Sequence, residues 1–102
     1  MEKEEKKEKI KRIGVVHVQE ATITLKIEVT ITYIYKNAKF TISNDNTLTY
    51  DLSTIDLEEK KEYIEKIESD LEQEVYSKFQ KIKKNIEFLE SLGYTLTFRT
   101  QS

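Results

Sequence analysis

Apolar and polar residues alternate from Ala21 to Tyr35, with apolar side chains at the odd positions and mainly Thr, Lys and Glu at the even ones. A period of two is typical of a β-strand with one buried face. The sequence therefore predicts a long strand over 21–35. A shorter strand is predicted over 13–19, and because no glycine or proline follows it, a bulge within one bent strand is one interpretation of the connection.

The apolar positions change parity after Lys36-Asn37-Ala38, so that 39–52 carries its apolar residues at even numbers. The segment 44–46, Asn-Asp-Asn, interrupts this pattern and is typical of a turn or a bulge. Two interpretations fit: a single bulged strand over 39–52 that pairs with 21–35, or two short strands joined by a turn at 44–46. We favour the turn.

A long helix is predicted after Asp56, which with Glu59 has the spacing of a capping box. Gly93 stands where a left-handed C-cap would end the helix. Its apolar stripe, with a period near 3.6, consists of Ile64, Ile67, Leu71, Val75, Phe79, Ile82, Ile86 and Leu89. A straight helix of this length exceeds the diameter of a compact domain, so we expect a break near Asp70, a helix shared with a second subunit, or an elongated domain; the long strand favours elongation.

The two ends of the chain complete the predicted fold. Residues 1–12 are charged and predict a frayed helix or a disordered segment, whereas Tyr94, Leu96 and Phe98 alternate with polar residues and predict a final strand. The fold class is α+β: an antiparallel sheet of three to four strands packed on one long helix, kinked or straight, in the order (α)βββαβ. Residues 13–102 are predicted to form a single domain.

Charge and composition narrow the function classes. The 17 Lys and Arg residues nearly balance the 19 Asp and Glu residues, so the long-range field that attracts nucleic acid is weak. The chain has no cysteine, which excludes disulfides and thiolate metal ligands and suits a cytoplasmic protein. It also has no apolar run of about 18 residues, so we expect neither export nor membrane insertion.

The candidate chemistry for catalysis is sparse. His17 is the only histidine and lacks the second ligand or carboxylate that metal binding or acid-base work requires, so we expect a structural or surface role for it. The glutamates of the helix alternate with lysines, as on a solvated face, and Gly14 and Gly93 are too few for a phosphate-binding loop. We expect no enzymatic activity, no cofactor and no metal.

Three helical aromatics fall outside the apolar stripe: Tyr63 and Phe88 on one side, and Tyr76 on the other. Exposed aromatics often anchor protein partners. We therefore expect a protein-interaction module that binds a protein or peptide partner at a groove or at a sheet edge, by strand addition. The length of the helix and of the strand predicts, in addition, a homodimer.

The alternative hypothesis is a weak nucleic-acid-binding protein without sequence specificity. It rests on Lys78, Lys81 and Lys84 of the helix and on Arg99 of the predicted last strand. Lys83 belongs to the same local cluster, and at 100° per residue the four lysines point in different directions. They also complement the dipole of a helix whose first half is acidic.

In composition the chain resembles the small orphan proteins of viruses and plasmids of hyperthermophilic archaea. The likeness rests on abundant Ile, Lys, Glu and Tyr, on the run Glu87-Phe88-Leu89-Glu90 that closes at Leu92-Gly93-Tyr94, and on the absence of cysteine and proline. It implies an intracellular protein that acts in the host cytoplasm, often as a dimer or a partner-binding module. It implies no site residues.

Overall fold

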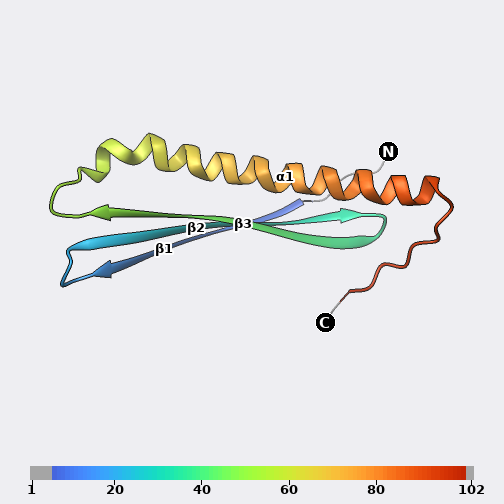
Figure 1. Ribbon diagram of the computed structural model, residues 1–102, viewed down its shortest axis with the longest axis horizontal. Helices are drawn as coiled ribbons and strands as arrows, with labels where there is room; N and C mark the ends of the chain where they lie inside the picture. The colour runs from blue at the N-terminus through green and yellow to red at the C-terminus, as the bar shows by residue number, and fades with distance from the viewer. Residues whose placement is uncertain (1–5, 101–102) are drawn as a thin grey trace.

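The computed structural model describes residues 6–100 as three strands and one long helix in two layers (Figure 1). The strands are β1 (Lys6–His17), β2 (Thr22–Tyr35) and β3 (Ala38–Asp51), and they are followed by the short 3₁₀ helix η1 (Leu57–Lys60) and by α1 (Lys61–Ser91). The α+β class, the antiparallel sheet and the single long helix are therefore confirmed.

The three strands form an antiparallel meander in the order β1-β2-β3. Lys6 lies opposite Tyr33 and His17 opposite Thr22 across the first pair, and the second pair runs without a bulge from Thr22 opposite Asp51 to Tyr35 opposite Ala38. The predicted strand over 21–35 is therefore confirmed as the centre of the sheet.

The predicted turn at 44–46 is wrong, because these residues continue β3 in regular pairing with β2. Two of the three polar side chains have a partner on their own face of the sheet. Asn44 donates a hydrogen bond to Glu74 of α1, and the Asp45 carboxylate lies 3.5 Å from the Lys26 ammonium. These contacts let the polar residues remain in a strand. The single strand of the first interpretation is therefore correct, but the bulge it included is absent.

Two tight turns connect the strands. Lys36 and Asn37, with φ of 53° and 62°, form the two-residue connection between β2 and β3, as expected of the turn type that matches strand twist. Residues 18–21 connect β1 to β2 and end at Ala21, with φ of 54°. The connection is thus a hairpin turn, and the bulge in one bent strand is wrong.

The helix expected over the charged N-terminal segment is wrong for the described residues, because Lys6–Arg12 belongs to β1. Pairing with β2 satisfies the backbone of this segment, whereas a short isolated helix with few apolar residues is marginal in water. Residues 1–5 lie outside the described residues.

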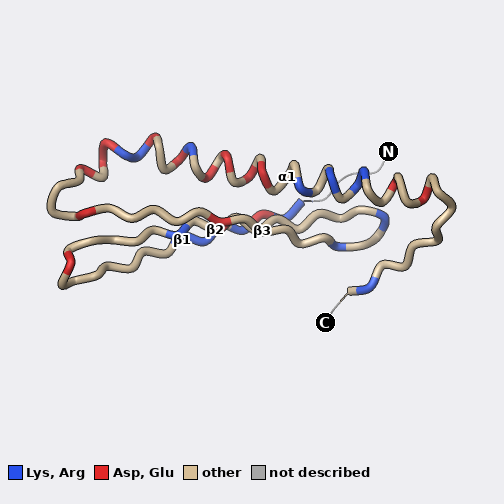
Figure 2. Tube along the Cα trace, viewed as in Figure 1, with Lys and Arg blue, Asp and Glu red and all other residues tan. Residues whose placement is uncertain are grey.

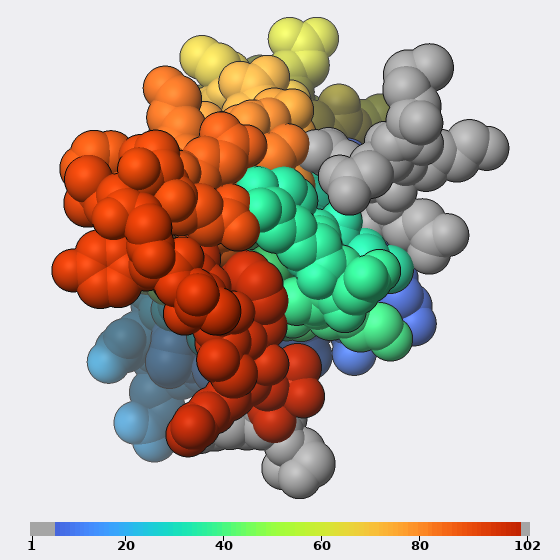
Figure 3. All heavy atoms as spheres, turned by 90° about the vertical axis from the view of Figure 1, so that its right-hand side faces the viewer, coloured from blue at the N-terminus to red at the C-terminus, as the bar shows by residue number. Residues whose placement is uncertain are grey.

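The predicted final strand is also wrong. After Gly93 the chain runs back beside the β2–β3 hairpin without forming a strand, and it contacts the hairpin through side chains (Figure 3). The Phe98 ring meets the Phe40 ring edge-on at a centroid distance of 6.1 Å, and Leu96 packs against the core. The sheet consequently has three strands.

Both ends of the helical segment use the predicted residues. The Asp56 carboxylate accepts a hydrogen bond from the Glu58 backbone N–H, which caps η1 directly before α1. At the other end Gly93 has φ of 95°, and Tyr94 N–H donates to the Leu89 carbonyl at 3.2 Å, as in a Schellman cap. The helix is continuous through Asp70, so a break there, one of the three interpretations of its length, is absent.

The core is a single layer between β2 and α1. It contains the odd-numbered residues of β2, which meet the predicted stripe of α1, and the Tyr33 ring stacks on the Phe79 ring at a centroid distance of 4.1 Å. The molecule measures 60 × 27 × 22 Å, so elongation accommodates the long helix. The buried core residues are Ile27, Val29, Ile31, Tyr33, Tyr35, Ile42, Ile67, Leu71, Val75, Phe79 and Ile86.

Phe79→Ala tests this core. Phe79 is fully buried, so its truncation leaves a cavity and is expected to lower the free energy of unfolding by about 3–5 kcal/mol, measured by urea denaturation. Phe88→Ala on the same helix is the matched control, because Phe88 is 60% exposed and its loss should change stability by about 0.5 kcal/mol or less. Equal losses in the two variants would contradict the described packing.

Candidate interaction surface along strand β1

The helix covers only part of the sheet. α1 packs on β2 and β3, while β1 lies outside its cover (Figure 1). Within β1 only Ile10 is half-buried, and every other residue of the strand is exposed. An entire edge strand and the sheet face above it are therefore accessible.

β1 has two chemically different halves. Its first half, Lys6–Arg12, is basic. The second half, together with the first residue of the following turn, exposes β-branched apolar side chains: Ile13 by 46%, Val15 by 49%, Val16 by 52% and Val18 by 83%. We call residues 13–18 the apolar edge. It forms the lower left margin of the molecule in Figure 1.

A groove runs between β1 and the first turns of α1. Above Gly14, which has no side chain to fill the space, a cavity of about 280 Å³ is lined by Leu25 of β2 and Ile64 of α1. The Arg12 guanidinium closes one side with two hydrogen bonds to the Glu68 carboxylate, at 2.6 and 3.0 Å. The groove therefore joins the apolar edge to a partly exposed part of the core.

Further along the same groove, two carboxylates face each other across the layers. Glu72 of α1 shares a hydrogen bond with Glu8 of β1, and this contact, followed by burial and by the Glu8 charge, raises the pKa of Glu72. Lys6 nearby acts in the opposite direction. When both carboxylates are ionised, the pair therefore places like charges together beside α1.

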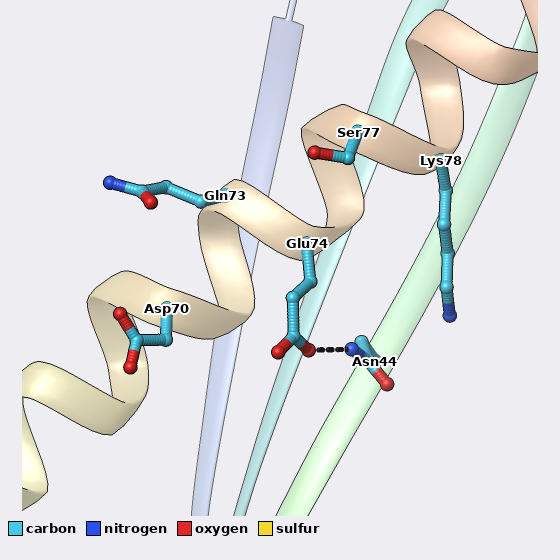
Figure 4. A pocket seen from close by; sticks show the side chains of 6 residues that line it. All are labelled: Asn44, Asp70, Gln73, Glu74, Ser77 and Lys78. Atoms are coloured by element: carbon cyan, nitrogen blue, oxygen red, sulfur yellow. Dashed lines mark hydrogen bonds between the residues drawn. The ribbon is translucent and has the colours of Figure 1, made fainter.

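The opposite flank of α1 has a different character. A larger hollow of about 480 Å³ lies against β3, where Glu74 and Lys78 point towards the sheet and Asp70 and Gln73 point away from it (Figure 4). Asn44 donates to Glu74 across its floor. All the side chains that line the hollow are polar, so it lacks the aliphatic side chains that line the groove above Gly14.

The three aromatics predicted to bind a partner are exposed but do not form one surface. Tyr63 is 53% exposed and Phe88 60%, and 25 residues of helix, or about 37 Å, separate them. Tyr76 is 46% exposed; its ring lies 6.3 Å from Tyr33, and its hydroxyl accepts a hydrogen bond from Gln80.

The basic residues of the nucleic-acid hypothesis are likewise dispersed. Lys78 lines the hollow beside Glu74, whereas Lys81 and Lys84 are exposed elsewhere on α1. Arg99 belongs to the C-terminal segment that follows α1 and turns away from the helix (Figure 2). These four residues therefore do not form one continuous basic stripe.

The apolar edge is the feature that sequence reasoning missed. The valines of 13–19 predicted a strand, but nothing in the pattern indicates that this strand has no neighbour on one side. The row of lysines on the uncovered face of β1 was missed for a related reason, because its segment was predicted to be a frayed helix or disordered. These lysines are Lys7, Lys9 and Lys11.

The remaining chemistry of residues 6–100 gives no metal or membrane signature. His17 Nε2 lies 3.2 Å from the Thr24 hydroxyl on the exposed face of the sheet. No group of three or more His, Cys, Asp or Glu side chains in this part of the chain could hold a metal ion. Nor does it contain a helix long and apolar enough to cross a membrane.

The chain matches no protein-family model, no curated protein and no solved structure.

Glu72→Gln tests the carboxylate pair. Because the folded-state pKa of Glu72 is raised above its ordinary 4.5, its contribution to stability is fully present below about pH 4.5 and is lost as pH rises through the raised value. The variant keeps a hydrogen-bonding partner for Glu8 and removes the repulsion, so it should be more stable than the wild type at pH 7 and less dependent on pH. Urea denaturation between pH 4 and pH 7 measures both.

Glu65→Gln, an exposed position of α1, is the control and should leave the pH dependence unchanged. A Glu72→Gln variant that is less stable than the wild type at pH 7 would contradict the described pair.

Proposed function

We propose that this chain is a non-enzymatic protein-interaction module that binds a β-strand of a peptide or of another subunit along β1. The observation that carries the proposal is the apolar edge: an exposed run of β-branched residues on an edge strand that the helix leaves uncovered. An edge strand presents unpaired backbone N–H and C=O groups, and strand addition satisfies them while the side chains confer specificity.

The groove above Gly14 supports this assignment. A strand added at β1 would place side chains of alternate residues over the groove, where Leu25 and Ile64 are only half-buried. Burial of such apolar area contributes roughly 25 cal/mol per Å². The bound strand would thus extend the core that α1 leaves incomplete.

The polar chemistry of the exposed sheet face favours binding over catalysis. Thr30 and Ser43 share a hydrogen bond across β2 and β3, and so do Thr32 and Thr41. These hydroxyls are therefore committed to cross-strand contacts that stabilise the sheet. Nucleic-acid binding is the alternative hypothesis, and the same experiment tests it.

The proposal predicts the outcome of an affinity capture from lysate of the source organism. Val15→Lys places a charge at the centre of the apolar edge, and a charge on an edge strand disfavours strand addition. A protein captured by the wild-type chain should therefore be lost by Val15→Lys and should be retained after nuclease treatment. Mass spectrometry with quantification against the wild type measures this.

Thr49→Lys is the matched control. Val15, Thr24 and Thr49 form one row across the uncovered face, so this variant places the same charge in the same row at the opposite edge. It should capture the partner as the wild type does. Capture that is lost on nuclease treatment would instead favour the nucleic-acid hypothesis, and capture that Val15→Lys leaves intact would overturn the role of β1.

A further inference from the structure

The two edges of the sheet differ in how they are protected. At β3, the C-terminal segment packs Phe98 on Phe40, and polar residues fill the middle of the strand. The first half of β1 carries lysines, which discourage edge pairing. The apolar edge has none of these protective features: it has no acidic side chain, no lysine, no proline and no bulge. The second half of β1 is therefore the part of the sheet edges best able to accept a strand.

The apolar edge is complementary to itself. If two copies of β1 pair antiparallel about Gly14, each residue i lies opposite residue 28 − i of the second copy. Ile13 of each chain then faces Val15 of the other on the uncovered face of the sheet, in two β-branched cross-strand pairs. Arg12 faces Val16, but its guanidinium is already bound by Glu68 of its own chain.

Within residues 11–17 this register places no like charges opposite each other. About Gly14, Lys11 lies opposite His17 and no lysine lies opposite another. Glu20, in the turn after β1, falls opposite Glu8 of the second copy, which lies outside the pairing over residues 11–17 and limits the interface to that segment. An axis at Lys11 would instead place that lysine opposite itself, and like charges in that position are destabilising.

We propose that the occupant of the apolar edge is a second copy of this chain, paired antiparallel through β1 about Gly14. The inference rests on the proposed function and names its partner. A two-fold axis perpendicular to the sheet makes the interface isologous, so each chain contributes the same residues to it.

The dimer forms a continuous sheet of six strands in the order β3-β2-β1-β1-β2-β3, with both helices on one face. Three to four strand spacings, or about 14–19 Å, then separate the helix axes. Helices with their side chains are about 10–12 Å wide, so a groove remains between them. Its floor consists of the helix-facing residues of both β1 strands: Ile10, Arg12, Gly14 and Val16.

Light scattering on the purified full chain tests the association. Pairing over residues 11–17 is a small interface, so the mass should rise with concentration from 12.1 kDa towards twice that value. Val15→Lys should remain at 12.1 kDa throughout, whereas Thr49→Lys should follow the wild type. A wild-type chain that is monomeric at every concentration, or a Val15→Lys variant that associates as the wild type does, would overturn the proposal.

Single cysteines test the register, because the chain has none of its own. A Cβ at Gly14 would meet Leu25 and Ile23 side chains at 3.5 and 3.6 Å, which is ordinary contact. Gly14→Cys should therefore form a disulfide with Gly14→Cys of a second chain faster than Lys9→Cys or His17→Cys does. Thr49→Cys, on β3, measures the background rate of random crosslinking. A maximum at Lys9, or rates equal to the background at all positions, would overturn this register.

The two proposals fail separately. A partner that is captured from lysate and lost by Val15→Lys, together with a purified chain that is always monomeric, would keep β1 as the binding strand and overturn the second copy as its occupant. A dimer with the predicted crosslinks would identify the occupant even if no other protein is captured.

Discussion

The structure depends on a match in length between α1 and β2. The 31 residues of α1 and the 14 residues of β2 both extend over about 46 Å, so the helix lies along the strand and buries its odd-numbered residues from Ile27 to Tyr35. Val29 and Tyr33 on the strand meet Val75 and Phe79 on the helix at the centre of this contact. The long helix therefore needs no break, and the molecule is elongated.

The same constraint creates the candidate interaction surface. A helix about 10 Å wide covers two strands that lie about 4.8 Å apart, and the third strand falls outside its cover. β1 is that strand. Its contacts with α1 are made by long side chains, as between Arg12 and Glu68 and between Glu8 and Glu72. The apolar edge is exposed because the core has one helix for three strands.

Much of the fold could be predicted from periodicity. The alternation over 21–35 identified the central strand, the stripe from Ile64 to Leu89 identified α1, and Gly93 identified its end. The errors lie where long-range pairing overrides local propensity. The charged residues of β1 join the sheet because β2 satisfies their backbone, and Asn44 remains in a strand because Glu74 binds it.

The site could be predicted less well than the fold. Exposed aromatics such as Tyr63 and Phe88 are visible as positions off the helical stripe, but the sequence does not show that they lie far apart. The apolar edge could not be recognised, because its valines have the same pattern whether a strand is central or at an edge. Strand order, which depends on contacts distant in sequence, decides between the two.

Amide hydrogen exchange of the wild-type chain, compared between dilute and concentrated solutions, tests the role of β1 most directly. The edge-directed amides of residues 11–17, which in an isolated chain have no partner strand, should exchange more slowly on concentration, while the amides of β3 keep their rates. Slower exchange confined to β3 or to α1, or rates in β1 that do not change with concentration, would contradict association through this strand.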